Sequence, residues 1–501
     1  FMLIRRERSL IIGHAAAVVI GLCASLPNRA VTAQERGDGA RTWTDETGEY
    51  RIVATMIKYD EGNVHLEKAD GQIIVIPLSK LSPSDQRWVR KKLARLRANK
   101  KREPADEPRA TETAPTTAEW PGWRGPNRDG KSADTGLLKQ WPPEGPELAW
   151  SVNDIGKGFS SVAVANDTVY ITGDTNNRLM LFALDLNGRP QWKVEIDAAW
   201  TKSSPGARST PTIDGNNLYL VSGNGVVGCY DAGDGRSKWK HHMREFGGGT
   251  PHWGYSESVL LYQNLAVITP GGSNCIVALD KSSGHPVWNS QGVKAGAQYS
   301  SCYAFTHDGV PMIVNGTAEG IVCVDPRNGR MLWANPFSAR NTANCPTPVY
   351  GDGYVFWANG YGKGGICLKL VSTDGGVAAQ QAWTTRDMVC HHGGYIIHDG
   401  HIYGNNGNGW ACLELATGKQ LWQERGVGKG SLCYADGMLY LFGERGGKVG
   451  LATCTPEGLE MRGSFSVQGD GPSWAHPVVI GGRLFIRYDT NLYCYNVREG
   501  G

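Results

Sequence analysis

The stretch Ala278-Leu279-Asp280, followed by Gly284 and Trp288, is one copy of a motif that recurs along this chain. Two apolar residues end in an acid, a glycine comes four residues later, and a tryptophan four residues after that. The other copies are Asp231 with Trp239, Asp325 with Trp333, Glu414 with Trp422 and, one residue shorter, Asp185 with Trp192. Counting a weaker copy at Trp383, successive tryptophans lie 39 to 50 residues apart. Repeats of this length are typical of propeller blades.

Each copy predicts a strand, a turn and a second strand. Residues 276–280 alternate as a strand does, and Asp-x-x-x-Gly supplies turn chemistry. The acid accepts hydrogen bonds from backbone amides of the turn, and glycine tolerates a positive φ. A tryptophan ring at the same place in each outer strand would bury about 150–250 Å² between neighbouring blades. We therefore interpret these tryptophans as packing residues and not as ligand contacts.

The composition also fits a chain of many short strands. Among 501 residues, 67 are glycine, and tryptophan (17) and tyrosine (19) outnumber phenylalanine (10). This profile is typical of short strands joined by tight turns. A formal net charge of +3 over this length indicates no nucleic-acid partner.

The N-terminal stretch, residues 1–33, has the pattern of a secretion signal. Arg5, Arg6 and Arg8 form a basic start, residues 10–26 are apolar, and Val31-Thr32-Ala33 fits a signal-peptidase site. The apolar run of 17 residues is short for a transmembrane anchor. We therefore expect an exported protein, periplasmic, at the cell surface or secreted, with no membrane span in the mature chain.

Cysteine positions argue against a disulfide framework, although cleavage of the signal leaves eleven cysteines. Cys229, Cys323 and Cys412 each lie two residues before the acid of a motif copy, and Cys367 and Cys494 occupy comparable places. Equivalent positions in successive blades are not expected to come close enough to bridge, which predicts small buried apolar residues. The pattern leaves four others open: Cys302, Cys345, Cys390 and Cys433.

A separate small domain is predicted over residues 41–97. Strand patterns cover residues 51–59, 63–68 and 72–77, and a helix follows with Ser82 or Ser84 as its cap. The domain resembles the SH3-like SLA-one homology domain. The resembling stretches are Arg41-Thr42-Trp43-Thr44, residues 66–71 (Leu-Glu-Lys-Ala-Asp-Gly) and residues 75–81. The resemblance implies a module that binds a protein or peptide, and a spacer domain is the alternative. Residues 98–118 are expected to be a disordered linker.

The remaining chain, residues 120–498, is expected to form a closed all-β ring. Residues 148–152 are an outer-type strand with no blade before it, and the last blade lacks such a strand. Trp150 should therefore complete the last blade and leave no exposed edge. Counting outer strands, including a degenerate one near Phe465, gives an eight-bladed β-propeller. Seven blades is the fallback if residues 457–465 are an insertion.

This region resembles the quinoprotein-type propeller superfamily through the repeated motif described above. Within it, the chain is similar to exported PQQ-binding-like, BamB-like propellers of planctomycete-type bacteria. That similarity rests on residues 253–258 (Trp-Gly-Tyr-Ser-Glu-Ser), 391–394 (His-His-Gly-Gly) and 428–431 (Gly-Lys-Gly-Ser). The resemblance leaves the activity open.

Candidate site residues lie near the first strand of each blade, which lines the central channel of a propeller. Buried ionisable groups are costly unless they are paired or serve a function. One interpretation is therefore a network of ion pairs along the channel, with Arg208–Glu257 or Lys429–Glu257 pairs. The other is a ligand site. Glu257, His391, His392 and Lys429 are the catalytic candidates. The ligand-binding candidates are Arg208, Trp253, Tyr255, Glu257, His391, His392, Lys429, Trp474 and His476. No metal site is predicted, because neither H-x-H nor H-E-x-x-H occurs at these positions.

Three functions follow from these residues. In the resembled enzymes PQQ lies between a tryptophan and a disulfide of adjacent cysteines, beside Ca²⁺, with an aspartate base. Trp253 or Trp474 and Glu257 match parts of that set, but adjacent cysteines are missing. The leading hypothesis is an exported binding scaffold. A PQQ- or metal-dependent alcohol or sugar oxidoreductase that uses Glu257, His391, His392 and Lys429, with PQQ and Ca²⁺ as its cofactors, is second. Carbohydrate binding through Trp253, Tyr255 and Trp474 is third.

Overall fold

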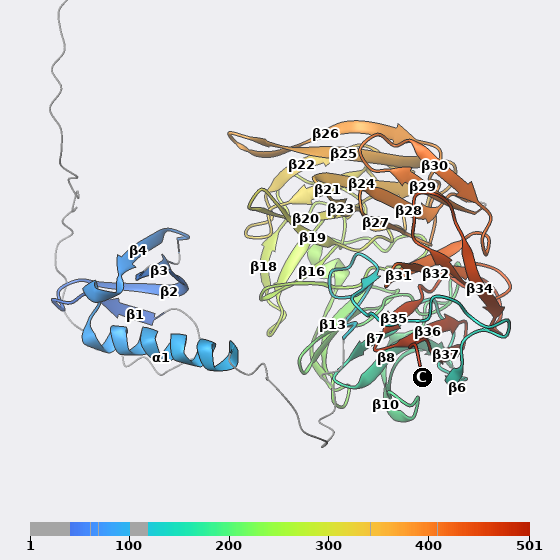
Figure 1. The fold of residues 1–501 in the computed structure, drawn as a ribbon, viewed down its shortest axis with the longest axis horizontal. Coiled ribbons are helices and arrows are strands. Elements are labelled where there is room, and N and C mark those ends of the chain that lie inside the picture. Colours follow the sequence, from blue (N-terminus) through green and yellow to red (C-terminus); the bar gives the residue numbers. More distant parts are fainter. Residues whose placement is uncertain are drawn as a thin grey trace, which may run out of the picture. The chain divides into compact units, whose positions relative to one another are not determined.

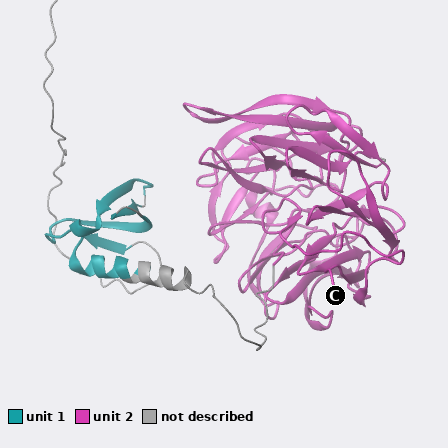
Figure 2. Cartoon of the chain, viewed as in Figure 1, with its two compact units in different colours: residues 1–112 teal, residues 113–501 magenta. Residues whose placement is uncertain are grey.

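The computed structural model describes residues 41–60, 62–68, 70–100, 119–340, 342–407 and 409–500. The predicted signal peptide and residues 101–118 of the predicted linker lie outside this part of the chain. The chain divides into two compact units, residues 1–112 and 113–501 (Figure 2). Within the described residues, no helix has both the length and the apolar character needed to span a membrane.

The first unit is a four-stranded antiparallel sheet followed by a helix. Its elements are β1 (Arg41–Thr44), β2 (Arg51–Asp60), β3 (Asn63–Lys68), β4 (Ile73–Pro77), the 3-10 turn η1 (Leu78–Lys80) and α1 (Pro83–Lys100). Trp43 is buried in its core and donates from Nε1 to the carbonyl of Ala54 at 2.9 Å. Asp85, buried in the first turn of α1, accepts from Arg41 Nη2 at 2.6 Å and from the Thr44 amide at 2.8 Å. Helix and sheet are thereby held together. The three predicted strands and the helix that follows them are confirmed, and β1 is a further strand.

The described part of the second unit contains eight sheets, seven of four strands and one of five, which follow one another around a ring (Figure 1). The first sheet consists of β7 (Ala163–Ala165), β8 (Thr168–Thr175), β9 (Arg178–Asp185) and β10 (Pro190–Ala198), and the second of β11 (Thr212–Asp214), β12 (Asn217–Val221), β13 (Val226–Asp231) and β14 (Ser237–His242). The third consists of β15 (Leu260–Tyr262), β16 (Leu265–Ile268), β17 (Val277–Asp280) and β18 (Pro286–Asn289). The fourth consists of β19 (Tyr303–His307), β20 (Val310–Gly316), β21 (Ile321–Val324) and β22 (Met331–Asn335). A 3-10 turn, η2 (Met243–Phe246), follows β14.

The other four blades complete the eight-bladed β-propeller. They are β23 (Val349–Gly351), β24 (Tyr354–Asn359), β25 (Gly364–Thr373) and β26 (Gly376–Thr385); β27 (Tyr395–His398), β28 (His401–Asn405), β29 (Trp410–Glu414) and β30 (Gln420–Glu424); β31 (Gly430–Ala435), β32 (Met438–Gly443), β33 (Lys448–Thr453) and β34 (Met461–Ser466); and β35 (Val478–Ile480), β36 (Arg483–Tyr488), β37 (Asn491–Asn496) and β6 (Leu148–Val152). The short strand β5 (Lys131–Ser132) adds a parallel fifth member beside β31.

Ring closure follows the sequence expectation. Strand β6 pairs antiparallel with β37, and Trp150 lies opposite Cys494. The first blade is thus joined to the last by a strand from the N-terminal side of the propeller, which leaves no blade with a missing outer strand. Strand β34 contains Phe465 and is the expected degenerate outer strand, so the fallback of seven blades is not needed.

The recurring tryptophan connects each blade to the next. Trp288 donates from Nε1 to the carbonyl of Pro326, which follows Asp325 in the next blade, at 2.9 Å. Its ring lies against Gly329, where a Cβ would come within 2.5 Å of Trp288 Cε3. The same glycine contact recurs at Gly188 with Trp150, Gly235 with Trp192, Gly284 with Trp239 and Gly418 with Trp383. The tryptophans are therefore packing residues, as interpreted from the sequence.

The acid of the motif organises the turn between the third and fourth strands. Oδ1 of Asp231 accepts from the Gly233 amide at 2.9 Å, and the Gly235 amide donates to the Asp231 carbonyl at 2.8 Å. In the next blade, hydrogen bonds from Ser282 and Ser283 hold the pKa of Asp280 at about 2. The glycine is required because its φ is near 74° to 77° at Gly235 and Gly284 and the ring of a neighbouring blade occupies the space of a Cβ.

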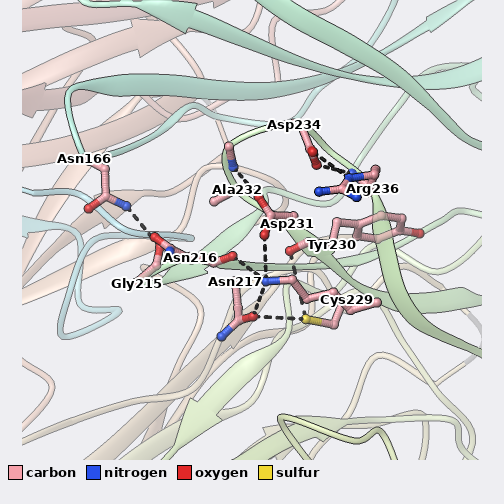
Figure 3. Close-up of polar contacts among 12 residues, drawn as sticks. Asn166, Gly215, Asn216, Asn217, Cys229, Tyr230, Asp231, Ala232, Asp234 and Arg236 are labelled. Carbon is pink, nitrogen blue, oxygen red and sulfur yellow. Dashed lines mark hydrogen bonds and ion pairs between the residues drawn. The ribbon is translucent and has the colours of Figure 1, made fainter.

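The described cysteines are all free, and the five at the blade position are buried. Cys229 shows their environment: its Sγ lies 3.8 Å from Asn217 Oδ1 on the neighbouring strand (Figure 3). This confirms the interpretation of these cysteines as small core residues without disulfide bonds.

Candidate functional site

A cavity of about 250 Å³ lies where the inner ends of the blades converge. Most of its lining residues come from the irregular segments that precede the first strand of a blade. Seven blades contribute in this way, through the segments before β7, β11, β15, β19, β23, β27 and β35, and the blade that begins with β31 does not. Trp123, from the segment before the propeller, and Tyr361, from the turn after β24, complete the lining. The cavity is therefore axial and built by the whole ring.

One wall of the cavity is a row of stacked rings. His391 and His392 lie with ring centroids 3.7 Å apart, and Tyr361 contacts His391 at 4.7 Å. His392 stacks on Trp474 at 4.1 Å, and Trp474 contacts Phe159 at 4.6 Å. Trp253 and Tyr299, 5.7 Å apart, also line the cavity. Flat apolar surfaces thus dominate the site.

The two histidines of this row are neutral at pH 7. Burial, assisted by the charge of Lys429, lowers the pKa of His391 to about 4. Burial and the neighbouring His391 lower the pKa of His392 well below its ordinary value. Nε2 of His391, Nδ1 of His392 and Nε1 of Trp474 are buried and have no hydrogen-bond partner. Three polar ring atoms in the row are therefore left for a ligand.

Arg208 is the only cation among the described residues that line the cavity, and none of them is an aspartate or glutamate. Its guanidinium donates to the carbonyls of Ser203, Ser204 and Gly206. Burial lowers the pKa of Arg208 to about 10, and nearby Asp174 opposes this, so the group stays charged at pH 7. Burial raises the pKa of Asp174 to about 7 against the attraction of Arg208. Arg208 therefore supplies the one positive charge of the described lining.

The structure brings five of the sequence candidates to the cavity: Arg208, Trp253, His391, His392 and Trp474. Tyr255 and Glu257 do not reach it. Ser256 and Ser258 line the cavity. Successive side chains of an extended segment point in opposite directions, so Tyr255 and Glu257 point away from the cavity. The Tyr255 hydroxyl donates to the carbonyl of Pro270, and Oε1 of Glu257 accepts from the Thr269 amide at 2.6 Å.

Lys429 and His476 lie behind the cavity wall. Lys429 forms an ion pair with Glu444 at 2.6 Å and lies 3.4 Å from Nδ1 of His391. His476 packs on Trp123 at 4.6 Å, and its Nε2 lies 2.9 Å from the carbonyl of His392. Both therefore support cavity residues without contacting the cavity.

The expected Arg208–Glu257 and Lys429–Glu257 pairs are not formed among the described residues. Arg208 is satisfied by carbonyls of its own loop, and Lys429 has Glu444. Glu257 is turned into the blade, where the nearest cationic influence is Arg128. The sequence placed these residues near one axis correctly, but the loop conformation decides which partners meet.

Other cavity residues were missed as candidates: Trp123, Phe159, Tyr299, Cys345 and Tyr361. Phe159, Tyr299 and Cys345 belong to segments that the sequence assigned to inner strands, so their position relative to those strands was the available signal. Tyr361 lies in a turn with a φ of 54°, and no pattern in the sequence marks it.

These residues do not fit PQQ with Ca²⁺. No carboxylate is among the described residues that line the cavity, so Ca²⁺ would lack its preferred oxygen ligands. Cys345 is the one described lining cysteine and has no adjacent partner. Glu257, the proposed calcium ligand, is buried outside the cavity with one oxygen bonded to Thr269. An aspartate base is likewise missing from the lining.

Glu257 should make the stability of the protein depend on pH. Burial raises its pKa to about 7 in the folded state, above the ordinary 4.5. Its contribution is therefore favourable below pH 4.5 and is lost as the pH rises through 7. We expect Glu257→Gln to be more stable than the wild type at pH 8, with the difference shrinking by about 2–3 kcal/mol at pH 5. Guanidinium unfolding at both pH values measures this.

Other titrating groups, such as Asp174, are present in both the wild type and Glu257→Gln. Their contributions cancel in the difference between the two free energies of unfolding. Glu245→Gln, at an exposed carboxylate whose pKa is lowered by a hydrogen bond from His241, serves as the control and should not gain stability at pH 8. A Glu257→Gln difference that is the same at both pH values would show that Glu257 does not titrate in this range.

Comparisons with known proteins agree with this architecture. Residues 181–424 match the PQQ_2 family, described as outer membrane protein assembly factor BamB, and residues 33–96 match SLA1 homology domain 1. Tetrathionate hydrolase of Acidithiobacillus ferrooxidans is 24% identical over 307 residues, which cover 57% of this chain and 50% of that protein. The chain spans about half the length of the curated relatives it matches first.

Solved structures show the same fold. BamB from Moraxella catarrhalis superposes with a TM-score of 0.53 at 15% identity, over 71% of this chain and 98% of that chain. A europium-containing methanol dehydrogenase superposes with a TM-score of 0.56 at 12% identity, over 75% and 90%. The fold is therefore that of an eight-bladed β-propeller. More particularly, the chain combines a BamB-like PQQ repeat domain with an SLA1 homology domain 1.

Proposed function

We propose that this protein is an exported, noncatalytic binding scaffold. Its axial cavity takes one small, flat, negatively charged organic molecule, and its SLA1 homology domain binds a protein or peptide partner. The observation that carries the proposal is a cavity of about 250 Å³ with aromatic walls and Arg208 as the one charged residue of its described lining.

The aromatic walls support a flat ligand. Ligand pockets are lined mainly by apolar and aromatic side chains, with few polar groups that fix the orientation. Here Trp253, Tyr299 and Phe159 supply flat surfaces, and the volume admits only a small molecule. A carbohydrate fits less well, because Tyr255 is turned away from the cavity and Trp474 is already stacked against His392.

Arg208 supports a negative charge on the ligand. A guanidinium has five N–H donors, and the three carbonyls around Arg208 use three of them. Two donors are left for an acceptor in the cavity, which Trp474, with its unpartnered Nε1, also lines. Hydrogen bonds to a charged acceptor are about twice as strong as neutral ones, which favours a carboxylate or another oxyanion.

The relatives support the remaining parts of the proposal. Several of them are named as outer membrane protein assembly factors, which favours an exported location and a protein partner. One relative is named as a hydrolase of tetrathionate, a small anion, which favours an anion in the cavity.

A matched pair of probes tests the cavity. 2-Naphthoate and 2-naphthamide share a flat body and differ in charge. We expect calorimetric titration to show at least about tenfold tighter binding of the carboxylate, equivalent to about 1.4 kcal/mol, because only the carboxylate pairs with Arg208. Arg208→Gln should abolish this preference while the weak binding of the amide remains.

Lys202→Gln is the matched control, since Lys202 lies in the same loop but does not line the cavity; it should bind both probes as the wild type does. Equal binding of the two probes, or a preference that survives Arg208→Gln, would refute the anion site. Ca²⁺-dependent, stoichiometric PQQ binding with alcohol oxidation would instead establish the dehydrogenase.

A further inference from the structure

Two neighbouring blades bring a thiol and two imidazoles together at the cavity wall. Sγ of Cys345, before β23, and one ring nitrogen each of His391 and His392, before β27, all lie within 4.8 Å of one another. Nε2 of His391 and Nδ1 of His392 are buried and have no hydrogen-bond partner. Thiolate and imidazole ligands select soft transition metals over Ca²⁺ and Mg²⁺. We propose that Cys345, His391 and His392 bind a single copper(I) ion.

The geometry is close to that of an occupied site. Sulfur and nitrogen ligands lie about 2.0–2.3 Å from a bound first-row metal, so any two of them are at most about 4.4 Å apart. Side-chain movements of a few tenths of an ångström would bring the three ligand atoms from their present separations to bonding distance from one ion. The stacking of His392 on Trp474 limits its rotation and holds the ligands in place.

The charges of the site select a monovalent ion. Arg208 lines the same cavity, and the Lys429 ammonium lies 3.4 Å from Nδ1 of His391. Copper(I) with one thiolate and two neutral imidazoles has no net charge. Zinc(II) with the same ligands would leave one positive charge in a water-poor site beside two cations, where like charges repel strongly. Copper(I) is therefore favoured over zinc(II).

Binding balances without a redox step. The thiol of Cys345 loses its proton to solvent as the sulfur–copper bond forms, and the copper stays in the +1 state, because metal coordination deprotonates a thiol outright. A neutral imidazole coordinates a metal through the lone pair of a ring nitrogen, so neither histidine has to lose a proton. The copper site goes beyond the proposed binding of an organic anion and does not depend on it.

Lys429 modulates the site from behind His391. Its ammonium lies 3.4 Å from Nδ1, which favours the tautomer with the proton on Nε2, the nitrogen without a partner. Binding copper at Nε2 requires the other tautomer and gives up this long contact, while Lys429 keeps its 2.6 Å ion pair with Glu444. Removing the ammonium should therefore strengthen copper binding.

The test is anaerobic competition for copper(I) between the full chain, without organic ligand, and the chromophoric chelator bathocuproine disulfonate. We expect the wild type to retain one equivalent of copper. Cys345→Ser and the double variant His391→Gln/His392→Gln should each bind at least about 100-fold more weakly. Cys454→Ser is the matched control, because Cys454 is also a partly exposed, free cysteine, and should bind as the wild type does.

Two further measurements keep the result independent of misfolding. X-ray absorption of the wild type should show one sulfur and two nitrogen or oxygen neighbours at bonding distance from copper. Lys429→Gln should tighten binding about tenfold, a gain that damage to the fold would not produce. No retained copper in the wild type, or retention unchanged by Cys345→Ser, would overturn the proposal. Failure of naphthoate binding would leave it standing.

Discussion

Trp288→Ala is expected to lower the free energy of unfolding by about 3–5 kcal/mol. Trp288 is 8% exposed, packs in the core between two blades and donates to the carbonyl of Pro326 in the next blade. Its removal leaves a cavity and an unpaired carbonyl at the same place. Guanidinium denaturation followed by far-ultraviolet circular dichroism measures the loss without relying on tryptophan emission.

Val287→Ala is the matched control, because Val287 is the preceding residue on the same strand and is 51% exposed; it should change stability by less than about 0.5 kcal/mol. Gly329→Ala adds a sharper test. A Cβ at Gly329 would meet Trp288 at 2.5 Å and the carbonyl oxygen of Asn289 at 2.8 Å. The two substitutions should be clearly non-additive, since removing the ring relieves the first of these clashes while the backbone clash remains. Strict additivity would show that the ring and the glycine do not pack together.

Arg487→Met should destabilise the propeller by about 3–5 kcal/mol. Arg487 lies on β36 in the last blade, is 2% exposed and donates to the carbonyls of Gly156, Ser160 and Thr172 on the side of the first blade. Burial lowers its pKa to about 9, which still leaves it charged at pH 7. Methionine fills similar space but removes a donor from each of these carbonyls, and only the Thr172 carbonyl keeps another side-chain donor, Ser160 Oγ at 3.1 Å. Each unsatisfied buried group costs about 1–3 kcal/mol.

Arg236→Met makes the same chemical change at an exposed turn, where Arg236 pairs with Asp234 at 2.6 Å (Figure 3). A surface ion pair contributes about 0–1 kcal/mol, so this control should unfold close to the wild type in calorimetry. If Arg487→Met were equally mild, the ring would be closed by the pairing of β6 with β37 alone, and the guanidinium would have no structural role between the first and last blades.

Sequence patterns identified the blades because their information is local. The strand, the Asp-x-x-x-Gly turn and the tryptophan strand fall within about a dozen residues, and the periodicity of each part is visible in the chain. The unmatched strand around Trp150 even predicted how the ring closes, as the pairing with Cys494 confirms. The charged candidates on inner segments were also placed near one axis, and Arg208, His391 and His392 do reach the cavity.

Site composition was harder to predict, because a shift of one residue in an extended segment reverses the direction of its side chain. Ser256 and Ser258 line the cavity, whereas Glu257 between them is buried in the blade with a raised pKa. Trp123 reaches the cavity from a segment outside the repeats, so no periodicity marks it.

The sequence by itself determined an SH3-like domain and an eight-bladed propeller, because local patterns encode strands and turns. Only the tertiary structure decided the site. Cys345 and the pair His391-His392 belong to different blades and meet because the ring brings the ends of adjacent inner strands together. Their burial beside Arg208 and Lys429 then sets their protonation, which is a property of the assembled ring and of no single segment.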